Sequence, residues 1–191
     1  MYEMETDMKF MDIVKKRESV RQFTDEPVSR DMIDRCIEAA RLAPSACNSQ
    51  PWKFIVVDDT KLRPEIAQAT WSKLALFNKF VQDAPVLVVI TVEKSGFAAQ
   101  IGGFLKDKPY YLFDIGIAAE HFCLQAAEEN LGTCMLGWFD EKRVQTLLNI
   151  PPSRRVALII AVGHSKHDTP REKRRKTLDE IRVFNQYQSG S

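Results

Sequence analysis

Residues 110–140 read YYLFDIGIAAEHFCLQAAEENLGTCMLGWFD, and they contain the longest helix that the sequence predicts, over 110–130. The polar side chains of this helix share one narrow stripe: Asp114, His121, Gln125 and Glu128. Because most other positions are apolar, the pattern predicts a deeply buried central helix. Gly132 is expected to end the helix, since glycine commonly follows the last helical residue. The run TCMLGWF then predicts a strand.

Two further helices are predicted upstream of this stretch. Phe10, Ile13 and Val14 have the i, i+3, i+4 spacing of a short amphipathic helix over 9–17. Arg17 is the next residue on that face, and a guanidinium at the inner end of an apolar stripe needs a polar partner. Residues 29–43 predict the second helix, with Ser29 as its N-cap.

The remaining elements alternate between strands and helices. Strands are expected at WKFIVVDD (52–59), APVLVVITV (84–92) and RVALIIAVGH (155–164), and helical segments at 60–80 and 140–148, the second of these capped by Asp140. Residues 93–109 are interpreted as a mobile loop or lid. The pattern alone therefore predicts a mixed α/β chain with a sheet of about four or five strands.

The composition predicts one compact enzyme-sized domain. The chain has 191 residues, 45% of them hydrophobic, with 27 Lys and Arg against 26 Asp and Glu. A balanced charge argues against a nucleic-acid binder, and no apolar stretch is long enough to span a bilayer. Four cysteines and three histidines show no metal-ligand spacing, so no metal is expected and reduced thiols in a cytoplasmic protein are the simpler interpretation. The expected domain covers 9–185, with flexible termini at 1–8 and 186–191.

Two basic clusters lie near opposite ends of the chain. Arg17, Ser19 and Arg21 alternate after the first helix, so in extended backbone they point to one side and could hold an anion. From spacing alone, a solvated basic turn is the favoured alternative. The run Lys173–Lys176 is either a second wall of the same phosphate site or an exposed basic tail.

Neutral polar residues dominate a third cluster, APSACNSQPW at 43–52. A pre-formed loop of this kind can recognise the edge of a heteroaromatic ring, although a polar turn is favoured from spacing alone. Gly137, at a strand end, would let a planar ligand approach the backbone, but a turn glycine is the simpler interpretation. His121 is interpreted as structural and Cys47 as a buried neutral thiol. Residue patterns alone thus lead to a soluble domain with a candidate anion site.

These clusters, in this order, resemble the FMN-dependent nitroreductase family. The resemblance runs from about Met11 to Ile181 and is carried by RESVRQF, APSACNSQPWKFIVV, GIAAEHFCLQAAEENLGTCMLGWFD and the ending KRRKTLDEI. It implies an α+β fold with a central, mostly antiparallel sheet flanked by helices. It also implies an intertwined homodimer with two FMN molecules at the interface.

The resemblance assigns expected roles to particular residues. Arg17 and Ser19 would hold the FMN phosphate and ribityl chain, joined by Lys173 and Arg175, and Arg21 would lie near the pyrimidine N1 edge. From the other subunit, the flavin would be reached by Pro44, Ser45, Ala46 and Asn48. The backbone of Leu136 and Gly137 would lie at the N5/O4 edge, and Asn78 is a further candidate contact to the pyrimidine ring.

Two residues depart from the family pattern. Glu18 replaces a basic or imidazole residue beside the phosphate site, and FMN affinity should fall if this acid points inward. Thr177 replaces a proline, which is a milder change. The implied chemistry is hydride transfer from NADH or NADPH through flavin N5 to a small-molecule acceptor such as a nitroaromatic or a quinone. Flavin reductase, dehalogenase, ene-type reductase and a non-catalytic FMN-binding protein are the alternatives.

Overall fold

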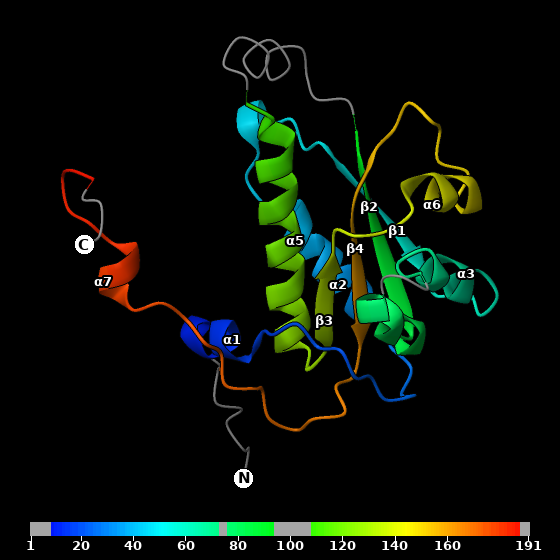
Figure 1. Cartoon of the computed structure of the whole chain (residues 1–191), viewed down its shortest axis with the longest axis horizontal. Helices are drawn as coiled ribbons and strands as arrows, with labels where there is room; N and C mark the ends of the chain where they lie inside the picture. Colours follow the sequence, from blue (N-terminus) through cyan, green and yellow to red (C-terminus); the bar gives the residue numbers. More distant parts are fainter. Residues whose placement is uncertain (1–8, 73–75, 94–107, 188–191) are drawn as a thin grey trace.

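A computed structural model describes residues 9–72, 76–93 and 108–187. Their centre is a four-stranded sheet with the order β1-β2-β4-β3, in which every neighbouring pair is antiparallel. The strands are β1 (Trp52–Val57), β2 (Val86–Val92), β3 (Gly132–Leu136) and β4 (Val156–Gly163). The expected α+β fold with an antiparallel sheet flanked by helices is confirmed (Figure 1).

Helices cover both faces of the sheet. The α-helices are α1 (Phe10–Lys16), α2 (Arg30–Arg41), α3 (Leu62–Gln68), α5 (Tyr110–Glu128), α6 (Glu141–Leu147) and α7 (Leu178–Ile181), and the 3-10 helices are η1 (Ala46–Asn48) and η2 (Leu76–Asp83). α2 and α5 pack on one face, where Val88 and Ile160 point. α3, η2 and α6 pack on the other, where Leu87 and Ile159 point. This alternation along β2 and β4 follows from the two-residue period of a strand, and it gives the sheet a core on each side.

Local sequence signals fix several helix starts. The Ser29 side chain accepts a hydrogen bond from the backbone N–H of Met32, and Asp140 does the same for Arg143. Both caps were expected, because a short oxygen-bearing side chain satisfies a backbone donor that lacks an intrahelical partner. In Figure 1, α2 and α6 lie on opposite sides of the sheet.

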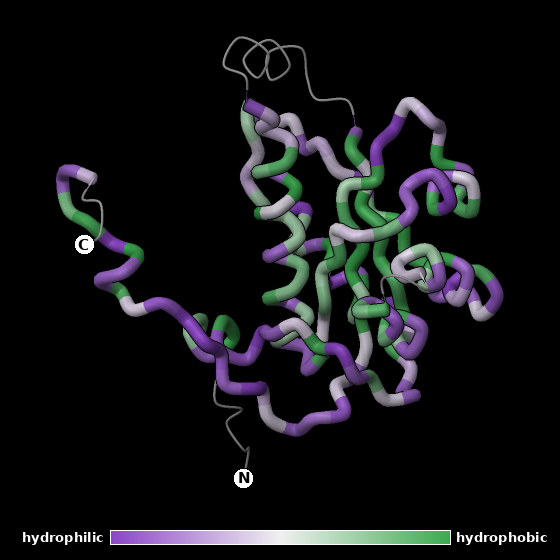
Figure 2. The backbone as a smooth tube through the Cα atoms, viewed as in Figure 1, coloured by the Kyte–Doolittle hydropathy of each residue, from purple (hydrophilic) through white to green (hydrophobic). Residues whose placement is uncertain are grey.

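The central helix differs from the sequence prediction in its burial and in the residue at which it ends. α5 is buried on one face only: Leu112, Phe113 and Ile117 on its other face are 50%, 57% and 40% exposed. Figure 2 shows that many residues of α5 are hydrophobic, coloured green, and that the helix lies at the margin of the fold. Deep burial of α5 all round is therefore wrong for the single chain, because no other element covers that face among the residues described.

Asn130, rather than Gly132, ends the central helix. Asn130 has a positive φ of 60°, and the N–H of Leu131 donates to the carbonyl of Ala126 at 2.7 Å, which closes the last turn. Gly132 is instead the first residue of β3. A Cβ there would lie 2.6 Å from Cγ2 of Val20, so the glycine is required by close packing.

The segment after α1 lies beside the segment that follows β4: Phe23 forms an antiparallel bridge with Ser165. Ser19 forms a parallel bridge with Thr133, and the N–H of Val20 donates to the Thr133 carbonyl at 2.8 Å, which extends the sheet beyond β3. The chain after β4 returns past α1 and then leaves the body as an arm that carries α7 (Figure 1). The expected lid at 93–109 and the expected flexible termini fall largely outside the described residues. No described helix is long and apolar enough to cross a membrane.

Candidate functional site

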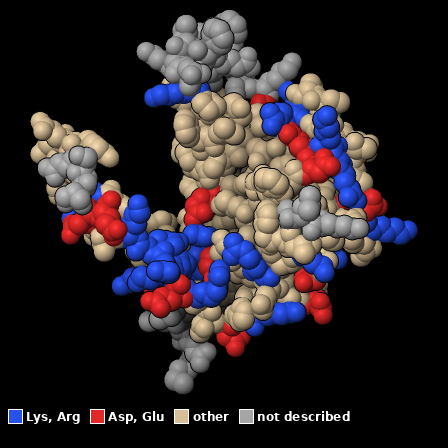
Figure 3. All heavy atoms as spheres, viewed as in Figure 1, with Lys and Arg blue, Asp and Glu red and all other residues tan. Residues whose placement is uncertain are grey.

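Side chains from both ends of the chain surround one cavity of about 210 Å³. Its lining residues are Arg17, Glu18, Ser19, Arg21, Arg171, Glu172, Lys173 and Arg175. Five cations and two carboxylates therefore face a common space. The expected phosphate-site residues of the N-terminal and C-terminal clusters are brought together, although they are more than 150 positions apart. Figure 3 shows the basic surface that this convergence creates around α1 and the C-terminal segment.

The first turn after α1 positions Arg17. Its Nε lies 3.2 Å from Oε1 of Glu120 on α5, which supplies the partner that the sequence required. The same nitrogen is buried and has no hydrogen bond of good geometry to any described residue. Arg17 is thus anchored to α5 by charge, and it also lines the cavity.

Lys173 connects the C-terminal segment to α1. Its ammonium donates to the carbonyls of Val14, at 2.9 Å, and of Lys15. Burial, together with the neighbouring charges of Arg17 and Arg175, lowers the pKa of Lys173. A cation at the C-terminal end of a helix also neutralises the negative end of the helix dipole.

Glu18 does not face the cavity as an unpaired acid. Its side chain is only 10% exposed, and Oε2 accepts from Nε of Arg171 at 2.9 Å. Arg171 also donates from Nη2 to the carbonyl of Ser19 at 2.8 Å. The sequence reasoning missed Arg171. The signal that could have found it was the acid in a basic cluster, since a carboxylate that becomes largely buried needs a cationic partner.

Arg21 lies at the edge of the same cavity. Its guanidinium carbon is 5.9 Å from the centroid of the Phe80 ring, and Nη1 donates to the Ser19 carbonyl at 3.4 Å. A guanidinium over an aromatic face keeps its charge while its orientation is restricted. Because Phe80 belongs to η2, this contact places the positive charge of Arg21 beside η2.

The polar loop at 44–48 lies near the start of α5, whereas α1 lies near the other end of that helix (Figure 1). The N–H of Ala46 donates to Oδ1 of Asp114, near the start of α5, at 3.1 Å, whereas Arg17 contacts Glu120 farther along that helix. Ser45 accepts from the N–H of Gln50 at 2.9 Å. Within one chain, the structure therefore does not bring Pro44, Ser45, Ala46 or Asn48 to the cationic cavity.

Cys47 in this loop corrects another expectation. Its side chain is exposed, whereas Cys36, Cys123 and Cys134 are buried. Cys47 and Asn48 both have positive φ values, of 53° and 50°, so the turn directs the thiol outward. The expected buried thiol at this position is wrong.

Gly137 and Asn78 form a separate part of the candidate site. Around Gly137, which follows β3 directly, no described heavy atom outside its two chain neighbours lies within 4 Å of the place of a Cβ. Nδ2 of the buried Asn78 donates to the carbonyls of Thr70, at 3.1 Å, and Trp138, at 3.2 Å. Both amide hydrogens of Asn78 are therefore used to hold the turn after Gly137, and only its oxygen is left for a ligand.

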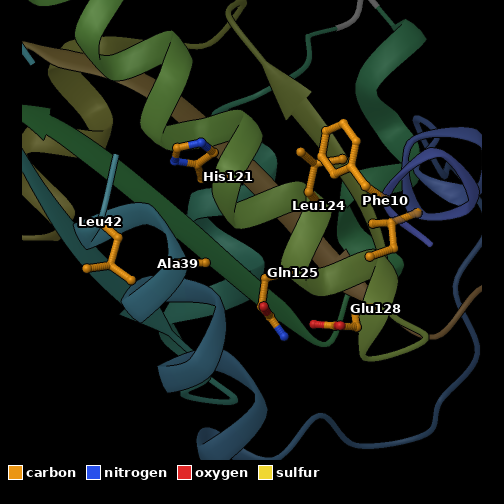
Figure 4. A pocket seen from close by; sticks show the side chains of 8 residues that line it. Phe10, Ala39, Leu42, His121, Leu124, Gln125 and Glu128 are labelled. Atoms are coloured by element: carbon orange, nitrogen blue, oxygen red, sulfur yellow. The ribbon is translucent and has the colours of Figure 1, made fainter. Parts of the chain in front are cut away.

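A second hollow lies between α1, α2 and α5. Its volume is about 290 Å³, and its lining includes Phe10, Ala39, Leu42, His121 and Leu124 (Figure 4). The surface is mostly apolar. Nδ1 of His121 is buried there without a hydrogen-bond partner among the described residues. The hollow lacks the cationic lining of the first cavity, so it is not an anion site.

The donor set of the cationic cavity fits a phosphate group. The paired N–H donors of an arginine guanidinium match the spacing of phosphate oxygens, and a lysine ammonium and a serine hydroxyl add further donors. Arg17, whose buried Nε has no hydrogen bond of good geometry to any described residue, is one of these arginines. The open backbone at Gly137 is suited to a flat ring. A cofactor with a phosphate at one end and a planar ring at the other matches both features.

The chain is similar in sequence and fold to known proteins. A model described as Nitroreductase family matches residues 14–164. A Streptococcus pyogenes protein that carries the name NAD(P)H nitroreductase is 29% identical over 203 residues, covering 91% of this chain and 98% of that protein. Rat iodotyrosine deiodinase 1 is 30% identical over 199 residues, covering 91% and 68%. The structure of an FMN-dependent nitroreductase from Clostridium difficile has a TM-score of 0.74 and 27% identity, covering 93% and 99%.

Proposed function

Because the chain belongs to the nitroreductase family, we propose that it is an FMN-dependent NAD(P)H oxidoreductase that reduces small conjugated acceptors. Nitroaromatics and quinones are the proposed acceptor classes. Bound FMN would supply the chemistry, accepting hydride from NADH or NADPH and passing electrons to the acceptor in a second half-reaction. The protein would supply binding, orientation and electrostatics. The observation that carries the proposal is the convergence of Arg17, Ser19, Lys173 and Arg175 on one cavity.

These four residues would bind the phosphate end of FMN. Arg17 is held by Glu120, and Lys173 by the carbonyls at the end of α1, so both cations are oriented before a ligand arrives. Pre-orientation reduces the entropy lost on binding. The side chain of Ser19 lines the same cavity and would add a hydroxyl donor.

Arg21 and the turn at Gly137 would act on the ring. A positive charge near N1 stabilises the negative charge that the ring gains on reduction. Arg21→Ala is therefore expected to bind FMN but to lower its reduction potential. A potentiometric titration of the bound flavin tests this, and an unchanged potential would remove the role from Arg21. The backbone at Leu136 and Gly137 would contact the N5/O4 edge.

The proposed assembly is a homodimer that completes each flavin site. The loop at 44–48 contacts Asp114 near the start of α5, whereas Arg17 of the cationic cavity contacts Glu120, six residues or about 9 Å farther along the helix at 1.5 Å per residue. A second copy running antiparallel along the exposed face of α5 would bring its loop to the first copy's cavity. The apolar side chains of that face would then be buried. Pro44, Ser45, Ala46 and Asn48 would thus serve the partner's flavin.

Reductive dehalogenation is a second candidate activity. It is favoured by the 30% identity to iodotyrosine deiodinase 1 over 91% of this chain. Flavin reductase and ene-type reductase activities would use the same fold and cofactor. In all of these the phosphate cavity has the same role, and only the acceptor differs.

The visible absorption spectrum of the purified protein tests the proposal. We expect a flavin spectrum, FMN on extraction, and bleaching when NADH or NADPH is mixed in without oxygen. A colourless protein that stays colourless after addition of FMN would contradict the cofactor assignment. A flavin that binds but is not bleached by either nucleotide would indicate a non-catalytic binding protein. A panel of nitroaromatic, quinone, halophenol and enone acceptors then identifies the activity from its products.

A further inference from the structure

The contact between Glu18 and Arg171 fixes the guanidinium of Arg171 in the lining of the cationic cavity. Oε2 of Glu18 accepts from Nε of Arg171 at 2.9 Å and from its backbone N–H at 3.4 Å. Nη2 of Arg171 donates to the carbonyl of Ser19 at 2.8 Å. A guanidinium has five N–H donors, so three remain for a ligand after these two side-chain bonds. Arg171 lines the cavity that would use them.

Two other cations of the cavity are also held in place by groups of the protein body. Arg17 faces Glu120 at 3.2 Å, and Lys173 donates to two carbonyls of α1. Arg171 is anchored at one end of its guanidinium only, and its side chain is 60% exposed. It therefore combines a fixed position with free donors, which is the requirement for a charge-assisted contact to a phosphate oxygen.

We propose that Arg171 binds the phosphate in this cavity and that Glu18 is the positioning residue that holds Arg171 in place. The identity of the phosphate as that of FMN rests on the proposed function. The proposal assigns a favourable role to an acid whose own charge opposes an anion. In the bound state, Glu18 would stabilise the phosphate indirectly, because it holds Arg171 in position. The charge of Arg171 would at the same time compensate the negative charge of Glu18.

Glu18→Ala should have opposite effects on FMN affinity in proteins with and without Arg171. In the otherwise unaltered protein, Glu18→Ala releases Arg171 and should weaken FMN binding by about tenfold, the equivalent of one charged hydrogen bond. In a protein that already carries Arg171→Ala, Glu18 is an unpaired carboxylate near the phosphate. There, Glu18→Ala should tighten FMN binding. Simple repulsion by Glu18 would instead give tightening in both backgrounds.

The experiment measures FMN and riboflavin dissociation constants by flavin fluorescence, using the full chain freed of flavin. FMN should bind most tightly to the unaltered protein and most weakly to Arg171→Ala, with Glu18→Ala and the double variant between them. Riboflavin has no phosphate, so its affinity should be the same in all four proteins. Arg174→Ala is the matched control, because it removes one charge from the same segment without lining the cavity. Its FMN affinity should change by less than about threefold.

Three results would overturn the proposal: tighter or unchanged FMN binding in Glu18→Ala, unchanged FMN binding in Arg171→Ala, or an equal loss of riboflavin affinity. If the unaltered protein binds neither flavin, the proposed function fails, and inorganic phosphate decides the role of the pair. Phosphate should then raise the melting temperature of the unaltered protein and have a smaller effect on Arg171→Ala and Glu18→Ala. Equal effects on all three would overturn the proposal.

Discussion

Two glycines illustrate opposite constraints at the scale of single residues. A Cβ at Gly132 would lie 2.6 Å from Val20, whereas a Cβ at Gly137 would have no described heavy atom within 4 Å apart from its two chain neighbours. We expect Gly132→Ala to lower the free energy of unfolding by about 1–3 kcal/mol, because overpacking forces the neighbouring backbone apart. Gly137→Val should change that free energy little but weaken FMN binding, since the added methyl groups would meet the flavin ring.

Urea denaturation of the flavin-free variants and FMN titration provide the two measurements. Gly132→Ala serves as the control for lost stability, and Gly137→Val as the test of ring contact. Unaltered FMN affinity in Gly137→Val would show that the flavin does not approach this backbone.

The four cysteines should differ sharply in reactivity. Burial raises the pKa of Cys36 and of Cys123 to about 12, and it also raises the pKa of Cys134. At pH 8 these three thiols stay protonated and shielded, and the thiolate is the reactive form. Only the exposed Cys47 should react rapidly with a thiol reagent in the native protein.

Mass spectrometry after brief alkylation would locate the modified cysteine, and denatured protein provides the control in which all four react. FMN should slow modification of Cys47, because its loop is proposed to contact the flavin of the partner. Labelling at equal rates with and without FMN would contradict that placement.

Side-chain predictions succeeded where the necessary partner was local or the requirement was general. Ser29 and Asp140 cap helices that begin at the next residue, so their sequence context was sufficient. Arg17 needed a partner, but its identity as Glu120 depends on how α1 meets α5. Arg171 escaped prediction for the same reason, since its contact with Glu18 spans 153 positions. The binding roles of these residues stay predictions.

At the scale of elements, α5 combines a buried face with an exposed apolar one. Its exposed residues Leu112, Phe113 and Ile117 are the surface that the proposed dimer would bury. Phe113→Glu should place a carboxylate in that interface and convert the dimer to monomer at micromolar concentration, because burial of an unpaired charge is costly. FMN affinity should fall with it, since the partner's loop at 44–48 is lost.

Analytical ultracentrifugation and FMN titration of the same sample test both effects. Thr146→Glu is the control, because it adds a carboxylate to an exposed position of α6, across the sheet from α5. If Phe113→Glu stays dimeric and binds FMN normally, this face of α5 is not the interface.

The same helix shows what periodicity can predict. Apolar residues on most sides of a helix indicate burial, but they do not distinguish packing within the chain from packing against a second copy. The strands were predicted well, because β2 and β4 are apolar along nearly their whole length. Their antiparallel order was not contained in that pattern. It came from the resemblance, since apolar runs are equally compatible with a parallel sheet.

At the scale of the whole molecule, the C-terminal arm that carries α7 lies away from the body of its own chain (Figure 1). Exposed apolar side chains recur along it: Leu178, Ile181, Val183, Phe184 and Tyr187. The capping box of Thr177 and Glu180 gives α7 a defined start, so the segment carries local structure. An arm with local structure and exposed apolar side chains, lying away from the described body of its own chain, is expected to pack on a second copy.

Removal of residues 177–191 should therefore leave a folded chain that dimerises at least about tenfold more weakly, because the buried apolar area of the arm is lost. The circular dichroism spectrum should stay close to that of the full chain, since the sheet and its two cores lie elsewhere. FMN affinity should become concentration-dependent, because each flavin site would need a loop from the partner. Removal of residues 188–191 alone is the control, as it keeps the five apolar side chains. Equal dimer dissociation constants for both truncations would mean that the arm does not hold the two copies together, and the exposed face of α5 would have to do so alone.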